Sequence, residues 1–425
     1  MGGPPSQILN EKIPLSLSLG TSRRKLGAVA ILARRVCVPY GVQRQRRCPI
    51  ARPDVIIVGG GIIGCSIAFY LAKAGLCPLV LEKTAVAAEA SSGGAGLLSA
   101  QAHTDERGAL FDLKLASRAL YPKLADELRE RTDMDIEYRQ IGHVVPAFSE
   151  ATASAVRARV SWQTGHGLPA RWLTAAEARE FEPGLPADVH GAGWFPEDDH
   201  INSTNTTQAL AGAVVRMGGK VRVECPVTDL VRDGHRITGV RTAQETISAA
   251  EVVVAAGAWS GQFEAAAGIP LPVFPAKGQI VVARLPQPAT RHVVYEEVYV
   301  IPRATGEHIL GSTVEYVGFD KRVTVEAIAG LLGEATRLVP ALREAEMVAS
   351  YACLRPASAD GLPLLGRVAG TPGLVMATGH FRNGILLAPI TGTLIADLIV
   401  QGRTAIPLAP FRPDRPFPPA PPPAG

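Results

Sequence analysis

The segment from residue 54 to residue 82 constrains the fold more than any other part of this chain. Residues 55–58 form a short apolar run, mostly β-branched, that ends in three consecutive glycines. Residues 62–74 then follow the pattern of an amphipathic helix, and a second apolar run, residues 79–81, ends at Glu82. This order and length predict a strand, a helix and a strand joined by a glycine-x-glycine-x-x-glycine turn, as in Rossmann-like folds.

The three glycines of the turn have separate physical roles. Gly59 permits the tight turn, Gly61 lets the backbone approach a pyrophosphate, and Gly64 lets the helix pack closely on the strand. Glu82 lies 18 residues after Gly64, where its carboxylate can accept hydrogen bonds from both hydroxyl groups of an adenosine ribose and would repel a 2′-phosphate. The motif therefore predicts a site for FAD or NAD rather than for NADP.

Two later segments favour FAD over NAD. Residues 87–99 are mostly small and several carry hydroxyl groups, which would let the backbone lie against a long ribityl-isoalloxazine group. Residues 251–255 form an apolar strand that leads into a turn at Gly257, the kind of turn that flanks the dinucleotide in two-domain flavoproteins. Because the sequence has no second glycine fingerprint, the flavin would be reduced by the substrate itself.

The middle of the chain has a different pattern. Residues 279–283, 293–301 and 308–314 are β-rich runs separated by proline and glycine turns, which predicts an antiparallel sheet. We therefore predict an α/β protein in which a Rossmann-like FAD-binding domain is interleaved with an antiparallel-sheet substrate domain. The expected FAD-binding segments are residues 53–138, 197–262 and 348–404, and the expected substrate-binding segments are residues 139–196 and 263–347. Helices are expected at residues 105–132, 204–217 and 323–337.

The two ends of the chain differ from its body in composition. Residues 1–52 hold ten Lys or Arg and one acid, whereas the rest holds 33 basic and 38 acidic side chains. We expect this basic leader to be disordered, and to be either a targeting peptide or an over-extended start. Because the body carries a net negative charge, binding of nucleic acid is disfavoured. Residues 405–425 form a proline-rich tail that we expect to run extended over the surface.

Several other classes of site are disfavoured. No run approaches 18 consecutive apolar residues, so no transmembrane segment is predicted. The six cysteines show no Cys-x-x-Cys spacing, so no metal site is predicted and a cytoplasmic location is expected. The acidic run at residues 197–199, with His200, is interpreted as a turn before a capped helix rather than as a set of metal ligands.

Residues 378–392 predict the start of a long helix. Gly384 precedes an apolar segment, so the helix should begin near Ile385 or Leu386 and run to about Gln401, with Pro389 in its first turn. Exposed N–H groups at its start would stabilise the negative charge that develops on a reduced flavin. The alternative is a glycine-rich helix cap that holds no ligand.

These segments together resemble one family of flavoproteins. The resemblance is carried by residues 58–64, 92–98, 111–113, 253–261, 354–356 with 360–361, and 379–389. They are similar to the D-amino-acid-oxidase-like flavoproteins over about residues 53–404, and most closely to the members that oxidise glycine in thiamine biosynthesis. The last of these motifs, Gly-His-Phe-Arg-Asn-Gly-Ile-Leu-Leu-Ala-Pro, is the most specific.

The resemblance assigns site residues position by position. Besides Gly59, Gly61, Gly64 and Gly257, it implies FAD contacts from Ile62, Ile63, Glu82, Lys83, Ala90, Ser91, Ala95, Gly96, Leu97 and Val227, and from the loop His380, Phe381, Arg382, Asn383, Gly384, Ile385 and Leu386. It implies that Arg355, Tyr299 and Arg382 line the substrate pocket.

Arg355 also stands out from the residues alone. A guanidinium at the edge of an apolar strand is costly unless an anion meets it, and a substrate carboxylate would fit its two-pronged geometry. The structural alternative is a salt bridge to an acid such as Asp360. Tyr299 could donate to the same carboxylate or be a half-buried sheet tyrosine, and Arg382 could be a solvated loop residue.

The reaction implied by the resemblance needs no side-chain base. The Cα hydrogen of a small amino acid would leave as hydride to the flavin N5, O2 would reoxidise the flavin to give hydrogen peroxide, and water would hydrolyse the imine. Glycine is the expected substrate and glyoxylate the product, with sarcosine and small D-amino acids as weaker substrates. The alternatives are a D-amino-acid or glycine dehydrogenase that passes electrons to a quinone or partner subunit, a sarcosine-type oxidase, and a noncatalytic FAD-binding partner.

Three positions leave details open. Glu297 stands where relatives carry a histidine, and Val314 stands where some carry a methionine, so substrate preference is open. Cys353 falls where monomeric sarcosine oxidases attach the flavin covalently, although non-covalent FAD is expected here because a buried cysteine is usually a small apolar residue. The resemblance further implies a homo-oligomer and a functional link to a thiazole-forming enzyme.

Overall fold

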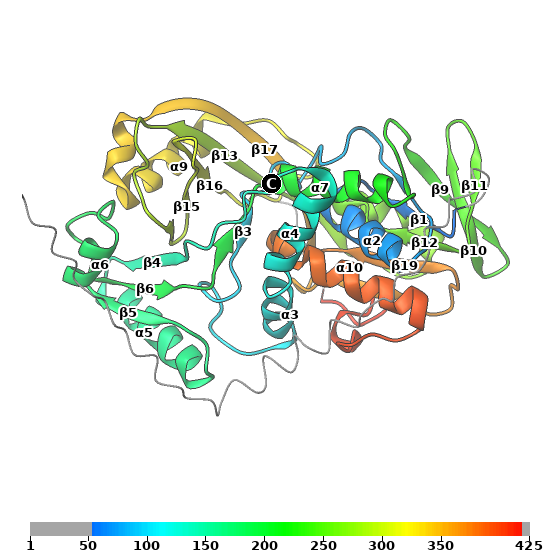
Figure 1. The fold of residues 1–425 in the computed structure, drawn as a ribbon, viewed down its shortest axis with the longest axis horizontal. Helices are drawn as coiled ribbons and strands as arrows, with labels where there is room; N and C mark the ends of the chain where they lie inside the picture. Colours follow the sequence, from blue (N-terminus) through cyan, green and yellow to red (C-terminus); the bar gives the residue numbers. More distant parts are fainter. Residues whose placement is uncertain (1–52, 419–425) are drawn as a thin grey trace, which may run out of the picture.

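The computed structural model describes residues 53–418, so the predictions for residues 1–52 and 419–425 lie outside the described residues. The described chain forms two lobes, each built on one large sheet (Figure 1). One lobe has a six-stranded sheet and the other an eight-stranded sheet. The predicted fold class, a Rossmann-like domain interleaved with an antiparallel-sheet domain, is therefore confirmed.

The six-stranded sheet has the strand order β18-β19-β12-β1-β2-β8. All neighbours are parallel except the pair of β18 and β19. Its strands are β1 (Val55–Val58), β2 (Pro78–Leu81), β8 (Lys220–Arg222), β12 (Glu251–Val254), β18 (Leu364–Arg367) and β19 (Leu374–Thr378).

Alternation along these strands builds two apolar layers. Val55 and Ile57 of β1 face a layer of helices, whereas Ile56 and Val58 face a small three-stranded sheet. The helices of the first layer are α2 (Ile62–Lys73), α3 (Ala109–Arg118), α4 (Tyr121–Thr132), α7 (Ser203–Arg216) and α10 (Gly384–Gln401). The small sheet comprises β9 (Val227–Asp233), β10 (Arg236–Thr242) and β11 (Thr246–Ser248). The expected helix at residues 105–132 is thus two helices.

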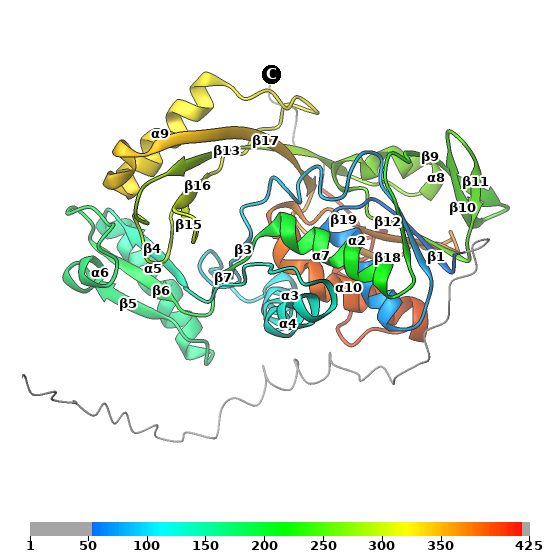
Figure 2. The ribbon, with the colours of Figure 1, turned by 45° about the horizontal axis from the view of Figure 1, so that its top comes forward.

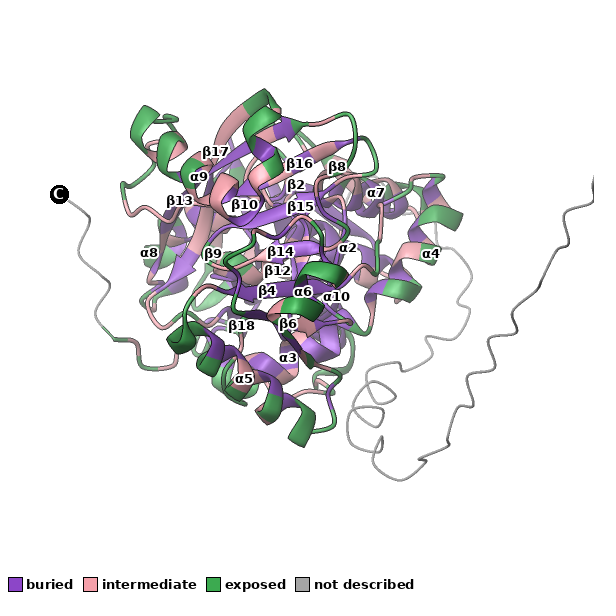
Figure 3. Cartoon of the chain, turned by 90° about the vertical axis from the view of Figure 1, so that its left-hand side faces the viewer, coloured by how far each residue is buried: buried purple, intermediate pink, exposed green. Residues whose placement is uncertain are grey.

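The eight-stranded sheet has the order β17-β13-β16-β15-β14-β4-β6-β5 and is antiparallel except where β14 pairs with β4. Its strands are β4 (His143–Ala147), β5 (Arg171–Thr174), β6 (Gly191–Phe195), β13 (Val273–Arg284), β14 (Val293–Tyr295), β15 (Tyr299–Pro302), β16 (Glu307–Gly311) and β17 (Glu346–Ser358). The helices α5 (Glu150–Gly165), α6 (Ala175–Phe181) and α9 (Val325–Leu338) pack against it, and their outer faces are exposed (Figure 3).

Two features of this sheet differ from the sequence expectation. The run at residues 293–301 is not one strand but two, β14 and β15, which form a hairpin. Strand β17 pairs with β13 along almost its whole length, so residues 348–358, which we expected in an FAD-binding segment, are hydrogen bonded into the substrate-side sheet. The two long strands run from α9 towards the six-stranded sheet (Figure 2), and so carry residues from one lobe to the other.

Short elements complete the described chain. A two-stranded ladder joins β3 (Leu97–Leu98) to β7 (Asp199–His200). The remaining helical turns are η1 (Gly257–Phe263), α8 (Glu264–Ala267), η2 (Pro340–Glu344), η3 (Phe381–Asn383) and η4 (Ala409–Phe411). The described part of the tail packs down instead of simply running over the surface, because Phe411 is buried and Arg415 pairs with Asp360.

Helix α10 is the central helix of the first layer. Together with η3 it is the one segment among residues 53–418 that is long and apolar enough to cross a membrane, but 72% of its apolar window is buried against the rest of the protein. Pro389 is its sixth residue, not a residue of its first turn as expected. A proline cannot donate to the carbonyl four residues earlier. That carbonyl, on Ile385, instead accepts a hydrogen bond from the Tyr121 hydroxyl, and the Ser117 hydroxyl donates to the next carbonyl at 2.6 Å.

Candidate functional site

A cavity of about 530 Å³ lies between the two sheets. The carboxyl ends of β1 and β12 form one side of it, and β15 and β17 form the other. Every residue predicted to contact cofactor or substrate lines this cavity except Gly64. The structure thus brings together residues that lie more than 300 positions apart in the chain.

The glycine turn at the end of β1 has the geometry that its motif predicts. Gly59 has φ +114°, and a Cβ atom there would lie 2.4 Å from the carbonyl oxygen of Ala255. A Cβ atom on Gly64 would lie 2.0 Å from the carbonyl oxygen of Gly59. Gly64 therefore brings α2 against β1, as the sequence predicts, and does this from outside the cavity wall.

The end of β2 offers a buried carboxylate to the same cavity. Glu82 accepts hydrogen bonds from the backbone N–H groups of Gly60, at 2.7 Å, and Thr84, at 2.9 Å. The Thr84 hydroxyl also donates to Glu82, at 3.2 Å. A carboxylate has about four acceptor positions, so Glu82 can still accept from a ribose hydroxyl group. The Ser91 hydroxyl accepts from the N–H of Ile62 at 2.8 Å, at the start of α2. This glycine-lined cradle with a terminal acid fits the adenosine half of FAD.

Lys83, a predicted cofactor contact, lies against Trp259, which was not among the predicted site residues. The Lys83 ammonium lies 3.0 Å from the centre of the Trp259 ring, which also lines the cavity. Burial lowers the pKa of Lys83, while the charge of Glu89 opposes that shift. Glu89 in turn lies 2.9 Å from Lys321, in the segment between β16 and α9. Ion pairs across the cavity edge therefore link the two lobes.

Arg355 has no carboxylate partner within ion-pair distance in residues 53–418. Its guanidinium donates to the Ser312 hydroxyl at 2.6 Å and to the Thr313 carbonyl at 3.1 Å. Asp360, the acid considered as its alternative partner, pairs with Arg415 at 2.7 Å. The structural salt bridge is therefore not formed, and the positive charge of Arg355 faces the cavity without compensation.

Tyr299 lies beside Arg355 on the cavity wall. Its side chain is buried, and burial raises the pKa of its hydroxyl, although the charge of Arg355 and a hydrogen bond with Ser312 oppose that shift. The hydroxyl therefore keeps its proton and is available as a donor. A guanidinium and a phenol that converge on one part of a cavity suit the binding of a carboxylate.

The loop before α10 contributes residues of two kinds. Arg382 lines the cavity and is exposed. His380 is buried, its Nε2 lies 3.1 Å from the Thr391 hydroxyl, and burial lowers the pKa of its imidazole to about 3. His380 is therefore neutral and tied to α10, which does not suit a general base.

Sequence reasoning missed several cavity residues. His103 packs its ring 3.8 Å from that of Tyr295 and is open to the cavity, yet enough protein surrounds it that desolvation lowers the pKa of its imidazole. Lys114 of α3 is half-buried, with a long 3.5 Å hydrogen bond to Thr104, and burial lowers the pKa of its ammonium. No local pattern marks these two residues, because the nearest motifs, residues 92–98 and 111–113, include neither of them.

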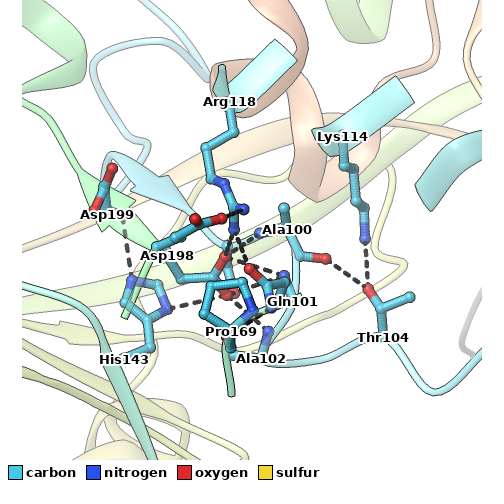
Figure 4. A network of polar contacts seen from close by, with 12 residues as sticks. Ala100, Gln101, Ala102, Thr104, Lys114, Arg118, His143, Pro169, Asp198 and Asp199 are labelled. Carbon is cyan, nitrogen blue, oxygen red and sulfur yellow. Dashed lines mark hydrogen bonds and ion pairs between the residues drawn. The ribbon is translucent and has the colours of Figure 1, made fainter. Parts of the chain in front are cut away.

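A buried carboxylate holds the loop that carries His103 in place (Figure 4). Asp198 accepts hydrogen bonds from the N–H groups of Ala100, at 2.9 Å, and Ala102, at 2.7 Å, and pairs with Arg118 at 2.8 Å. Its carboxylate thus serves as a backbone acceptor and ion-pair partner. No group of three or more His, Cys, Asp or Glu side chains within residues 53–418 has the arrangement of a metal site.

Cys353 is on the cavity wall and buried. Its Sγ lies 3.5 Å from the carbonyl oxygen of Gly93, and a Cβ atom on Gly93 would lie 2.4 Å from the Cβ atom of Cys353. Burial raises the pKa of its thiol, which keeps it in the less nucleophilic protonated form. This environment is that of a packed apolar side chain.

Comparisons with known proteins agree with this geometry. The sequence model of the DAO family, described as FAD dependent oxidoreductase, matches residues 54–398. Glycine oxidase from Geobacillus kaustophilus is 40% identical over 365 residues, which cover 85% of this chain and 96% of that protein. Its crystal structure superposes with a TM-score of 0.83, covering 86% of this chain and 100% of that chain at 39% identity.

A second relative is a fusion protein. The bifunctional protein ThiO/ThiG from a Nostoc species is 36% identical over 357 residues. The match covers 83% of this chain and 53% of that protein, so this chain spans about half of the fusion. On the family match, the relatives and the glycine-lined cradle, this chain belongs to the DAO family of FAD-dependent oxidoreductases, and FAD is its cofactor.

Proposed function

We propose that this protein is an FAD-dependent oxidase of small amino acids that converts glycine, O2 and water into glyoxylate, ammonia and hydrogen peroxide. The observation that carries the proposal is the uncompensated guanidinium of Arg355, which faces the cavity that also contains the FAD cradle. The similarity to glycine oxidases supports glycine as the substrate.

Arg355 and Tyr299 position the substrate in this proposal. The guanidinium binds the carboxylate of the amino acid, and the protonated Tyr299 hydroxyl donates to the same group. When bound, FAD supplies the two-electron acceptor for the Cα hydrogen and reacts with O2. His380 stays neutral and bonded to Thr391, so the amine loses its proton to solvent rather than to this side chain.

The start of α10 supports the cofactor side of the reaction. Its leading N–H groups, at residues 384–386, lie at the cavity wall, and the helix dipole would favour negative charge there. Cys353, protonated and packed against Gly93, favours non-covalent FAD. Precipitation of the protein with acid should leave the yellow colour in the supernatant, whereas colour in the pellet would indicate covalent attachment.

Anaerobic reduction by a panel of small amino acids tests the proposal. Glycine should bleach the flavin absorbance near its visible maximum, and admission of air should restore the colour with one hydrogen peroxide per glycine. Failure of every amino acid to bleach the flavin would contradict an amino-acid oxidase and favour a noncatalytic FAD protein. Bleaching without peroxide in air would instead indicate a dehydrogenase that needs a quinone or a partner subunit. A larger kcat/KM for sarcosine would indicate the N-methyl amino acid alternative.

The fused relatives support a role in forming the thiazole of thiamine, because an enzyme and the enzyme that uses its product are often joined in one chain. We include in the proposal a cytoplasmic location and a homo-oligomer. Light scattering on the purified protein tests its oligomeric state. A reporter fused to residues 1–52 tests whether the leader directs the protein elsewhere.

A further inference from the structure

One face of the eight-stranded sheet forms the floor of the substrate side of the cavity. Tyr299 of β15 is directly opposite Gly311 of β16, and Gly311 is opposite Ile280 of β13. Gly278, two residues before Ile280, is opposite Cys353 of β17. Because opposite residues share a face and side chains alternate along each strand, all of these positions face the cavity side.

Arg355 lies across this floor. It is opposite Ala276 and diagonal to Gly278, and its guanidinium reaches over β13 to Ser312 and Thr313, just beyond β16. A Cβ atom on Gly278 would lie 2.0 Å from Nη2 and 2.4 Å from Cζ of Arg355. The guanidinium therefore occupies the space that any other residue at 278 would fill.

The Tyr299 side chain lies over Gly311 in the same way. A Cβ atom on Gly311 would lie 2.3 Å from the hydroxyl oxygen and 2.4 Å from Cζ of Tyr299. Ser312, the next residue, accepts a hydrogen bond from the Arg355 guanidinium. Each of the two anchors therefore lies over one glycine of the sheet.

The sign of φ does not require glycine at either position. Neither residue has a positive φ, and glycine in the interior of a strand normally weakens it. The atoms that a new Cβ would meet belong to Arg355 at one position and to Tyr299 at the other. At both positions, therefore, a neighbouring side chain occupies the space where a Cβ atom would be.

We propose that Gly278 and Gly311 are positioning residues of the substrate pocket. Because each lacks a side chain, it leaves the space in which one carboxylate anchor lies: the Arg355 guanidinium over Gly278 and the Tyr299 phenol over Gly311. The inference rests on the proposed role of Arg355 and Tyr299. A methyl group at 278 lifts the guanidinium off Ser312 and into the cavity, which misplaces the carboxylate. The same change at 311 displaces the phenol. Neither change adds an atom to the glycine turn or to Glu82, which form the cofactor cradle.

A double-mutant cycle on Gly278 and Arg355 tests the proposal. The variants are Gly278→Ala, Arg355→Met and their combination, with Gly330→Ala as the matched control, because a Cβ at 330 meets nothing within 4 Å. The measurements are the FAD content, the Kd of acetate from the flavin spectrum, and KM and kcat for glycine. Acetate probes carboxylate binding without turnover.

Gly278→Ala should raise the acetate Kd and the glycine KM about tenfold or more, with kcat within about threefold and full FAD content. In the Arg355→Met background, the same change should alter the acetate Kd by less than about twofold, because the side chain that clashes is gone. Gly330→Ala should match the wild type. A Gly278→Ala protein with unchanged acetate Kd, or effects of the two changes that multiply, would overturn the proposal.

Folding defects are also informative. If Gly278→Ala fails to fold, the combined Gly278→Ala and Arg355→Met variant should fold and bind FAD, since it lacks the clashing guanidinium. If the combination also fails, Gly278 is needed for packing of the sheet itself and the inference is wrong. If glycine does not reduce the wild-type flavin but acetate binding still depends on both residues, the proposed function fails while this inference stands.

Discussion

Two regions of the cavity wall depend on glycine for different physical reasons. In the turn between β1 and α2, Gly59 has a left-handed backbone and Gly64 lets two main chains approach each other. On the sheet floor, Gly278 and Gly311 have no positive φ and make room for side chains from neighbouring strands. In the first region an added Cβ atom would meet main-chain atoms, and in the second it would meet another residue's side chain.

The difference determines what can be read from the sequence. The glycines of the turn lie within five positions of one another, so their spacing is itself a motif. Gly278 is 77 positions from Arg355, and the two meet only through the register of β13 with β17. A glycine that accommodates a distant side chain leaves no local pattern.

The largest expected effect on cofactor content is at the turn. Gly64→Val places a branched side chain against the Gly59 carbonyl and the Ile57 side chain, and overpacking of this kind costs about 1–3 kcal/mol or more. Because the strain lies in the turn between β1 and α2, which is part of the FAD cradle, we expect the purified protein to lack FAD and to be colourless. The measurement is the visible absorbance per protein chain, with circular dichroism as the check of folding. A folded variant with full FAD content would remove the distinction between the two regions.

The second effect separates the substrate anchor from the cofactor cradle. Arg355→Met removes the charge that meets the carboxylate, and loss of one partner of a buried charge pair costs about 2–5 kcal/mol. The kcat/KM for glycine should therefore fall about 30-fold to 5,000-fold while the FAD content is unchanged. Steady-state peroxide assays measure the first quantity. A variant that loses FAD, or one that keeps its kcat/KM, would contradict the assignment.

The third effect concerns Asp199, in the short ladder where β7 pairs with β3. Asp199 of β7 accepts a hydrogen bond from the Tyr138 hydroxyl at 2.6 Å, and burial raises the pKa of its carboxyl to about 6. A raised pKa in the folded state stabilises the protein below the ordinary pKa of an aspartate, and this stabilisation is lost as the pH rises through about 6.

Asp199→Asn keeps an acceptor for Tyr138 but cannot ionise. Relative to the wild type, the variant should gain up to about 3 kcal/mol in unfolding free energy between pH 4 and pH 8, because only the wild type must ionise a buried group. Melting temperatures of the two proteins at matched pH values test this. A difference between them that does not change with pH would argue against the raised pKa.

The smallest effect has the opposite sign. Gly330 lies in the interior of α9, is exposed, and leaves open space where a Cβ atom would be. Gly330→Ala should stabilise the protein by about 0.5–1 kcal/mol, because glycine loses more backbone entropy in a helix than alanine does. Denaturant unfolding measures the gain, and kcat/KM should not change. Destabilisation, or any change in kcat/KM, would show that this glycine also serves a neighbour.

The sequence predicted the parts of the molecule whose determinants are local. The β1, α2 and β2 unit, the start of α10 and the anchor Arg355 follow from short patterns and from a resemblance to a known family. The hairpin at residues 293–301 was missed because its turn lacks glycine and proline. The membership of residues 348–358 in the substrate-side sheet was missed because strand pairing is a property of distant segments. His103 and Lys114 reach the cavity through loop and helix placement, which no periodicity records.

The proline at the sixth position of α10 couples the choice of residue at two distant positions of the chain. Tyr121 supplies the hydrogen that residue 389 cannot give to the Ile385 carbonyl. A homologue with a residue other than proline at 389 has an amide hydrogen for this carbonyl and does not need a hydroxyl at 121. A homologue that keeps the proline but lacks the hydroxyl leaves the Ile385 carbonyl oxygen without this donor. We therefore expect these two positions, 268 residues apart, to change as a pair.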